Sequence, residues 1–145
     1  MRVLIVDDND DIRLSLRMVL EDADYLVSEA ADGQAALDIL IENDEPLLIV
    51  LDHHMPRMNG PELLQHIDQH PALARHRAFI FMSAVHDPMA DIAPLFARLP
   101  LSILQKPFDI TDVTDLVGRL AEAIAAPVAA YEHSAYGPVD GDLSS

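Results

Sequence analysis

A doubly wound α/β fold, with a five-stranded parallel sheet and helices on both faces, is predicted by two features of the sequence. The first is a set of short apolar runs without polar alternation, at 3–6, 47–51, 78–82 and 101–104. Such runs, bounded by turn residues, are typical of parallel strands buried on both faces. The second feature is helical periodicity between the runs, because alternating strands and helices favour a parallel sheet covered by helices.

The helices are predicted by apolar residues that recur three or four positions apart. The last helix follows Asp109, which is a plausible N-cap. Two more helices are expected to begin near Pro61 and Pro88, since proline is well tolerated in a first turn. The apolar faces with helical spacing fall at 12–23, 35–40 and 113–124.

The strand order follows from one polar strand. Residues 25–30 form a fifth strand that is more polar than the others, as suits the edge of a sheet. Right-handed crossovers restrict a parallel sheet to a few doubly wound orders. With the polar strand at one edge, we expect the flavodoxin-like order 2-1-3-4-5.

A single domain is expected, because 145 residues suit one packed core. The periodic pattern stops at Pro127, where the composition turns to proline, glycine, serine and aspartate. We therefore expect a domain over 1–126 and a flexible tail over 127–145, with no separate output domain.

Composition excludes several classes of function. The formal net charge is -16, from 25 Asp and Glu against 9 Lys and Arg, so nucleic acid and membrane are not expected partners. The absence of cysteine excludes disulfides, thiolate metal sites and cysteine nucleophiles. No signal peptide follows Met1 and no apolar run approaches the ~20 residues of a membrane span, so we expect a cytoplasmic protein.

Polar side chains stand directly after the apolar runs. In an open α/β sheet, ligands bind beyond the carboxyl ends of the strands, where the strand order reverses. We therefore expect these side chains, which include the only lysine of the chain, to share one crevice. They are Asp7, Asp8, Asp52, Ser83 and Lys106.

The chemistry of this group points to phosphoryl transfer. Three carboxylates repel one another and require a cation, and Mg²⁺ prefers such oxygen ligands. The ion would neutralise charge on an incoming phosphoryl group, while Ser83 and Lys106 would bind its oxygens. Asp52, on the middle strand, is best placed to attack, since carboxylates are known phosphoryl acceptors.

Short motifs near the predicted strand ends carry a family resemblance. They are Asp7-Asp8, Ala31-Asp32-Gly33, Met55-Pro56 with Met58-Asn59-Gly60 behind Asp52, Ser83-Ala84, and Lys106-Pro107-Phe108. In this order and spacing they resemble response-regulator receiver domains, which are phosphorylated signalling switches. The resemblance covers residues 2–126.

The resemblance implies a role for each acid of the crevice. Asp52 would be the phosphoryl acceptor and Asp8 a direct Mg²⁺ ligand. Asp7 would bind Mg²⁺ mostly through water, and the backbone carbonyl of His54 would complete the metal site.

The resemblance also implies how the switch would work. Ser83 would be the hydroxyl that moves toward the new phosphate, and Lys106 the cation that pairs with it. A cis bond before Pro107 would help to aim the lysine. Many receivers carry an aromatic residue where this chain has Ile103, so a switch based on a rotating ring is not expected here.

The expected phosphoryl donor is a sensor histidine kinase or a histidine phosphotransfer protein. Output would come from binding an unidentified downstream protein or from passing the phosphoryl group onward. The protein would be no enzyme beyond its own phosphorylation and dephosphorylation. Leu14 and Met18, flanked by Arg13 and Arg17, are candidates for docking the donor, although two exposed apolar residues can also be incidental.

Two other classes of function are compatible with parts of the sequence. A pseudo-receiver, which binds partners without being phosphorylated, is disfavoured by the complete set of five site residues. A phosphohydrolase of the haloacid dehalogenase type needs Asp-x-Asp at one strand end, whereas Asp52 is followed by His53 and His54.

Two histidine pairs raise the question of a transition metal. His66 and His70 are four residues apart on a predicted helix, but no third ligand is evident. His53 and His54 lie beside Asp52, where strand-end histidines need no metal to explain them. The sequence alone therefore favours a solvated face for His66 and His70, and no metal at His53 and His54.

Overall fold

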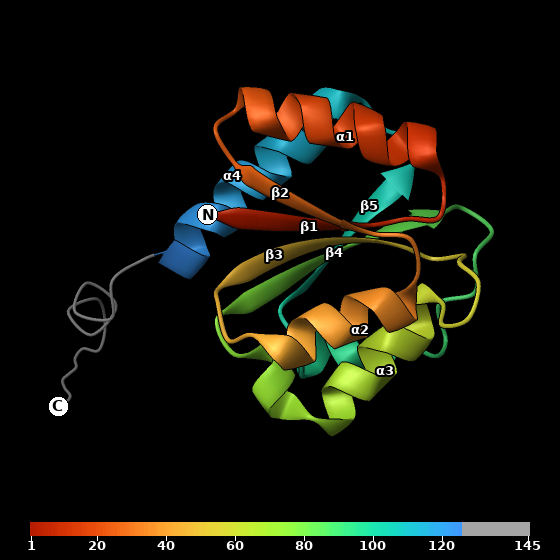
Figure 1. Ribbon diagram of the computed structural model, residues 1–145. Coiled ribbons are helices and arrows are strands. Elements are labelled where there is room, and N and C mark those ends of the chain that lie inside the picture. Colours follow the sequence, from red (N-terminus) through yellow and green to blue (C-terminus); the bar gives the residue numbers. More distant parts are fainter. Residues whose placement is uncertain (126–145) are drawn as a thin grey trace, which may run out of the picture.

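The five strands form one parallel sheet in the order β2-β1-β3-β4-β5, as the sequence predicts (Figure 1). This arrangement is seen in a computed structural model that describes residues 1–125, so the expected boundary at 126 and the tail over 127–145 lie outside the described residues. The strands are β1 (Arg2–Val6), β2 (Leu26–Ala30), β3 (Leu47–Asp52), β4 (Arg77–Ala84) and β5 (Leu101–Lys106).

Four α-helices cover the sheet in residues 1–125: α1 (Asp10–Asp22), α2 (Gly33–Glu42), α3 (Gly60–Gln69) and α4 (Ile110–Ala125). Helices α1 and α4 lie on one face, and α2 and α3 lie on the other (Figure 1). None of these helices is long and apolar enough to cross a membrane.

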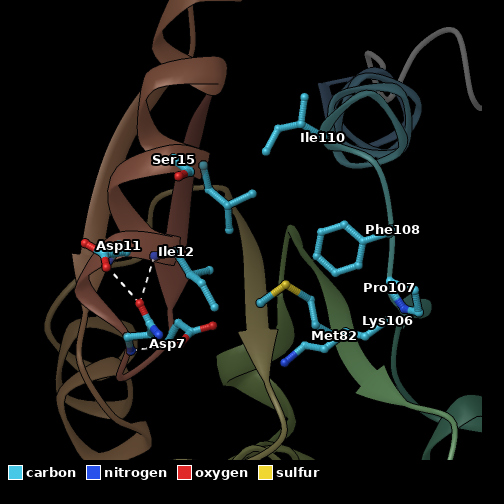
Figure 2. A pocket seen from close by; sticks show the side chains of 11 residues that line it. Asp7, Asp11, Ile12, Ser15, Met82, Lys106, Pro107, Phe108 and Ile110 are labelled. Carbon is cyan, nitrogen blue, oxygen red and sulfur yellow. Dashed lines mark hydrogen bonds between the residues drawn. The ribbon is translucent and has the colours of Figure 1, made fainter.

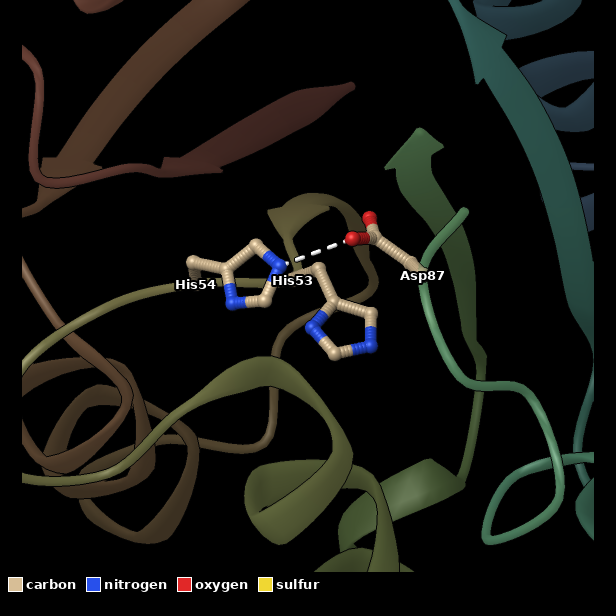
Figure 3. A group of neighbouring side chains, drawn as sticks. All are labelled: His53, His54 and Asp87. Carbon is tan, nitrogen blue, oxygen red and sulfur yellow. Dashed lines mark hydrogen bonds and ion pairs between the residues drawn. The ribbon is translucent and has the colours of Figure 1, made fainter. Parts of the chain in front are cut away.

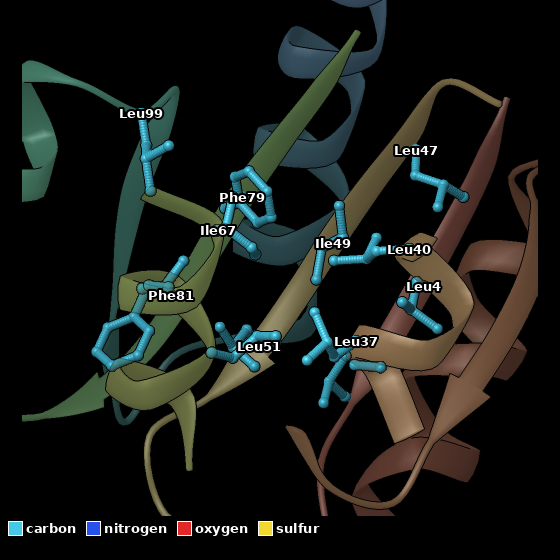
Figure 4. Close-up of a cluster of buried hydrophobic side chains, with 14 of the residues drawn as sticks. Leu4, Leu37, Leu40, Leu47, Ile49, Leu51, Ile67, Phe79, Phe81 and Leu99 are labelled. Atoms are coloured by element: carbon cyan, nitrogen blue, oxygen red, sulfur yellow. The ribbon is translucent and has the colours of Figure 1, made fainter. Parts of the chain in front are cut away.

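The core lies in two layers, one on each face of the sheet. Along β1, Leu4 and Val6 pack with α2 and α3, whereas Val3 and Ile5 pack with α1 and α4. All four side chains are fully buried, which explains why the run is apolar without alternation. Figure 4 shows the layer under α2 and α3, where Phe79 and Phe81 of β4 meet leucines and isoleucines of neighbouring elements.

Asparagine and aspartate caps fix where three of the helices begin. Asn9 accepts the amides of Asp11 and Ile12 at the start of α1. Asp32 accepts the amide of Ala35 at 2.8 Å at the start of α2. Asn59 forms a capping box with Glu62 on α3. Each cap satisfies backbone donors that a helix start leaves free, and so sets the path of the preceding loop.

The α-helix expected to begin near Pro88 is not formed. Between β4 and β5 the chain has only a 3-10 segment, η2 (Ala93–Ala97). Two features explain the difference. Asp87 folds back to accept the amide of Ala84 at 2.7 Å, which closes a turn. Pro94 would lie inside the expected helix, where its ring clashes with a preceding carbonyl and lacks the N–H donor.

Arg77 closes the end of the sheet opposite the expected site. Its buried guanidinium donates to four backbone carbonyls, and burial lowers the pKa of the group. The acceptors are the carbonyls of Leu40, Asn43, Glu45 and Leu73, at 2.7 to 3.3 Å; Leu73 belongs to the 3-10 segment η1 (Pro71–Ala74). One side chain therefore satisfies the main chain at the end of α2, in the following loop and in η1.

Candidate functional site

Three carboxylates meet at the carboxyl ends of the two central strands. Asp7 follows β1, Asp8 is next to it, and Asp52 is the last residue of β3. One carboxylate oxygen from each lies within 4.8 Å of the other two. Asp7 and Asp52 are buried, whereas Asp8 is exposed at the mouth of the group. The structure thus brings together the three acids that the sequence placed in one crevice.

The charge of this group is incompletely balanced. Burial raises the pKa of Asp7, and the neighbouring charge of Asp52 raises it further, against a hydrogen bond from the Asn9 amide at 2.9 Å. The second oxygen of Asp7, Oδ2, is buried with no hydrogen-bond partner among the described residues. A buried, unpartnered carboxylate oxygen beside two other acids suits a hard divalent cation.

Lys106 supplies the nearest positive charge. It ends β5, its Nζ donates to Oδ1 of Asp52 at 2.6 Å, and about a third of its side chain is exposed. The peptide bond to Pro107 is cis, as the family resemblance implies. Asp52 is thus held between two acids and one lysine.

Ser83 lies one strand away from Asp52 and is engaged elsewhere. Its hydroxyl is buried and approaches the carbonyl of Ala84, Oδ2 of Asp87 at 3.4 Å, and the sulfur of Met89. The same Oδ2 of Asp87 accepts the Ala84 amide at 2.7 Å. Asp87 is therefore part of the site, although no motif in the sequence marked it.

The loop after Asp52 contacts both Asp87 and the start of α3. His54 points its ring outward and places Nε2 at 2.8 Å from Oδ1 of Asp87. Gly60 begins α3 directly against this loop, with its amide donating to the carbonyl of His53 at 3.0 Å. A Cβ at Gly60 would lie 2.4 Å from the Asp52 carbonyl oxygen and 2.7 Å from Phe81, so only glycine fits.

A cavity of about 520 Å³ opens beside the acidic group, between α1 and the start of α4. Figure 2 shows Asp7 and Lys106 at one end, with Ile110 on α4 at the other. Phe108 and Ile12 form part of its apolar wall. Sequence reasoning missed this cavity, because its two walls are about 100 residues apart in the chain.

The candidate docking residues lie on the outer side of α1. Leu14 and Met18 are 56% and 59% exposed, and neither lines the cavity. The arginines that flank them are not free. Arg13 and Arg17 both pair with Glu29 on β2, and Arg17 also pairs with Glu21. The apolar pair is therefore exposed beside an ion-pair network that is already satisfied.

Comparison with known proteins identifies the family. The sequence profile of the response regulator receiver domain matches residues 3–118. Sporulation initiation phosphotransferase F of Bacillus subtilis is 34% identical over 120 residues, which cover 81% of this chain and 91% of that protein. Sensor kinase CckA of Brucella abortus is 35% identical over 123 residues, which cover 83% of this chain but only 12% of the kinase.

Solved structures show the same likeness in three dimensions. A CheY-like receiver domain protein from Methanospirillum hungatei superposes with a TM-score of 0.75 at 25% identity, over 85% of this chain and 95% of that one. The receiver domain of the hybrid histidine kinase CckA gives a TM-score of 0.66 at 29% identity, over 83% and 98% of the two chains. The chain belongs to the response regulator receiver domains of two-component signalling.

Proposed function

We propose that this receiver domain takes a phosphoryl group onto Asp52 from the phosphohistidine of a sensor histidine kinase or a histidine phosphotransfer protein. The observation that carries the proposal is the position of Asp52. Its carboxylate is buried among Asp7 and Asp8 and touches Lys106 at 2.6 Å. Acids and one lysine gathered at the carboxyl ends of parallel strands are the groups that phosphoryl transfer uses.

The residues at this crevice fit Mg²⁺. Asp8 and Asp52 would be direct ligands, Asp7 would act mostly through water, and the family resemblance adds the backbone carbonyl of His54. The unpartnered Oδ2 of Asp7 supports this assignment, because a buried anionic oxygen without a donor is costly in the absence of a cation. When bound, Mg²⁺ supplies positive charge that offsets the charge of the phosphoryl oxygens.

The transfer exchanges one bond for another. A carboxylate oxygen of Asp52 forms a bond to phosphorus as the phosphorus–nitrogen bond of the phosphohistidine breaks, and the imidazole nitrogen keeps that electron pair. Lys106 is already beside Asp52 and would pair with a phosphoryl oxygen of the product. Because Asp52 is only 5% exposed, its carboxylate has lost most of its hydration before transfer.

The switch would work through Ser83 and the loop after β4. The phosphoryl group adds about 1.5 to 2 negative charges and three strong acceptor oxygens. Ser83 would turn its hydroxyl toward them and leave Asp87, which now receives both the hydroxyl and the Ala84 amide. Loss of the contact between Ser83 and Asp87 would loosen the loop and so shift a two-state equilibrium. Ile103 packs against the core and has no aromatic ring to rotate.

The output we propose is protein binding or onward transfer of the phosphoryl group. A net charge of -16 supports this choice over nucleic-acid binding, because such a surface repels a phosphate backbone. We place donor docking on the outer side of α1, at the exposed side chains of Leu14 and Met18. The downstream protein is unidentified.

Intact mass spectrometry after incubation with Mg²⁺ and acetyl phosphate tests the proposal. We expect wild type to gain about 80 Da for one phosphoryl group, only when Mg²⁺ is present, and Asp52→Asn to gain nothing. Asp91→Asn, at an exposed acid outside the crevice, is the matched control and should be labelled like wild type. No adduct on wild type, combined with no binding of beryllofluoride, would favour an unphosphorylated interaction module instead.

A further inference from the structure

A second group of metal-ligating side chains lies next to the acidic crevice but uses different residues. It consists of His53 and His54, which directly follow β3, and Asp87, which lies in the loop after β4. One ring nitrogen from each histidine and a carboxylate oxygen of Asp87 lie within 4.8 Å of one another. Figure 3 shows the two rings and the carboxylate gathered between these two segments of chain.

His53 carries a free ligand atom in a buried position. Its Nε2 lies 3.3 Å from the carbonyl of Pro88, and only a protonated ring nitrogen can donate to a carbonyl. In this tautomer Nδ1 has the lone pair. Nδ1 is buried with no hydrogen-bond partner among the described residues, and His53 as a whole is only 5% exposed. An unpartnered imidazole lone pair is an available metal ligand.

The other two ligand atoms already face each other. Nε2 of His54 and Oδ1 of Asp87 are 2.8 Å apart, so a cation that displaces the shared proton would bind both atoms after they move slightly apart. The other oxygen of Asp87, Oδ2, accepts the Ala84 amide at 2.7 Å, which holds the carboxylate in this orientation. The ring of His54 is 69% exposed, which leaves an open path for the ion.

We propose that His53, His54 and Asp87 form a site for a transition-metal ion of the Zn²⁺ class. Two imidazoles and one carboxylate are ligands typical of Zn²⁺, with water in a fourth position. Mg²⁺ prefers ligands that are all oxygen atoms. Mg²⁺ would therefore bind in the acidic crevice, and Zn²⁺ would bind at the two histidines and Asp87. The sequence disfavoured a metal at His53 and His54 because strand-end histidines beside Asp52 need no metal to explain them. Asp87, which would be the third ligand, lies 33 residues beyond His54.

An ion at this site would tie the loop after β3 to the loop after β4. The second oxygen of Asp87 holds the Ala84 amide and the Ser83 hydroxyl. A cation on Oδ1 would therefore fix Asp87 and retain Ser83 in its present position. This consequence rests on the proposed function of Ser83 as the switch hydroxyl: Zn²⁺ would slow the response to phosphorylation while leaving Asp52 intact.

Calorimetric titration of untagged protein with ZnCl₂, in excess MgCl₂ to occupy the acidic crevice, tests the site. We expect wild type to bind one Zn²⁺. His54→Ala should lower the affinity at least about tenfold, since even removing an outer partner of a ligand costs about 10–100-fold. The matched control is His86→Ala, which changes an exposed histidine in the same loop as Asp87 and should bind like wild type.

Other outcomes overturn the assignment. If wild type binds no Zn²⁺, or if His54→Ala binds it equally well, the three residues are not a metal site. A loss of binding in His66→Ala instead would move the ion to the stacked pair His66 and His70 on α3, whose ring centroids are 4.7 Å apart. His54 is exposed, so its replacement should leave the fold intact, and circular dichroism verifies this.

The same titration separates this inference from the function proposed for Asp52. Asp52→Asn should bind Zn²⁺ as wild type does, because Asp52 contributes no ligand to the histidine site. Zn²⁺ binding that persists without any acetyl phosphate labelling would support the metal site and refute the acceptor. Normal labelling without Zn²⁺ binding would support Asp52 as the acceptor and refute the metal site. If the structural change that follows acetyl phosphate labelling, measured by circular dichroism, is equally fast with and without bound Zn²⁺, only the effect on Ser83 is refuted.

Discussion

The ammonium of Lys106 lies 2.6 Å from Oδ1 of Asp52, so the proposed acceptor is paired with a cation before any phosphoryl group arrives. The pair is asymmetric in exposure: the Asp52 side chain is 8% exposed and that of Lys106 is 36% exposed. Lys106 thus offsets part of the charge of three neighbouring acids, and it competes with a metal ion for Asp52.

Replacing Lys106 by methionine should therefore strengthen Mg²⁺ binding. Two unit charges about 4 Å apart near a protein surface interact by about 4 kcal/mol. Because Lys106 is partly exposed, we take about a third of this energy. It corresponds to a gain of about tenfold in the affinity for Mg²⁺. Calorimetric titration with MgCl₂ measures it. Arg119→Met removes an exposed cation from α4 and should leave the affinity unchanged; weaker Mg²⁺ binding by Lys106→Met would show that the lysine orients the acids instead.

Gly60→Ala should destabilise the domain by about 1–3 kcal/mol, because the new Cβ would overlap the Asp52 carbonyl oxygen and Phe81. Urea unfolding measures the change. Gly118→Ala is the matched control, since its Cβ meets nothing closer than the Tyr25 hydroxyl at 3.9 Å. Inside α4 that substitution should stabilise by about 0.4–1 kcal/mol. Equal stability of the two variants would mean that the Asp52 backbone and Phe81 move away from the new Cβ without lowering the free energy of unfolding.

Asp32 makes stability depend on pH. The Ala35 amide, followed by the Arg57 guanidinium, lowers the pKa of this buried carboxyl. Its contribution is fully present above the pKa of the unfolded chain and is lost as the pH falls through the lower folded value. Asp32→Ala should cost about 0.5–2 kcal/mol at neutral pH through loss of the cap.

Asp32→Asn isolates the charge, because the amide oxygen can still cap α2. At neutral pH this variant should be more stable than Asp32→Ala. The difference in unfolding free energy between wild type and Asp32→Asn should shrink from about pH 4 downward, where wild type becomes protonated. Urea titrations between neutral and acid pH measure the difference. If it widens on acidification, the Asp32 carboxylate is not the stabilising species.

Docking on α1 is tested by replacing Leu14 and Met18 together with aspartate. This variant should lose at least about tenfold in the rate of phosphotransfer from a histidine kinase that labels wild type, because hot-spot apolar contacts contribute about 2 kcal/mol or more each. Labelling by acetyl phosphate should be unchanged. Ile41→Asp, at a side chain 59% exposed on the other face of the sheet, is the matched control. Equal loss with both donors would refute docking there.

Much of the fold was predictable because four of the five strands contain a short apolar run in the sequence, and the fifth, β2, is the more polar strand expected at an edge. Leu47 to Leu51 are fully buried, and a run of that kind has few alternatives in a chain of this length. The segment after β4 was predicted wrongly. Pro88 suggested a helix start, but Pro94 and the turn held by Asp87 exclude an α-helix there, and only a 3-10 segment forms.

The acidic crevice was predictable for a topological reason, and its finer contacts were not. Asp7, Asp8, Asp52 and Lys106 end parallel strands, so the sheet itself brings them together. The partner of Ser83 depends on how the following loop turns back. Asp87 lies in that loop without a motif of its own, and its two oxygens are shared among three neighbouring groups.

Arg77 gives the molecule one anchored end. Its guanidinium cross-links four carbonyls at the end of the sheet where β4 begins, whereas Asp87 holds the loop after β4, at the opposite end, through three contacts. We therefore expect movement of the loop after β4 to cost less free energy than movement of the chain around Arg77. If phosphorylation moves the loop after β4, we expect a partner that distinguishes the two states to bind at the carboxyl ends of the strands, because Arg77 would hold the opposite end of the sheet in place.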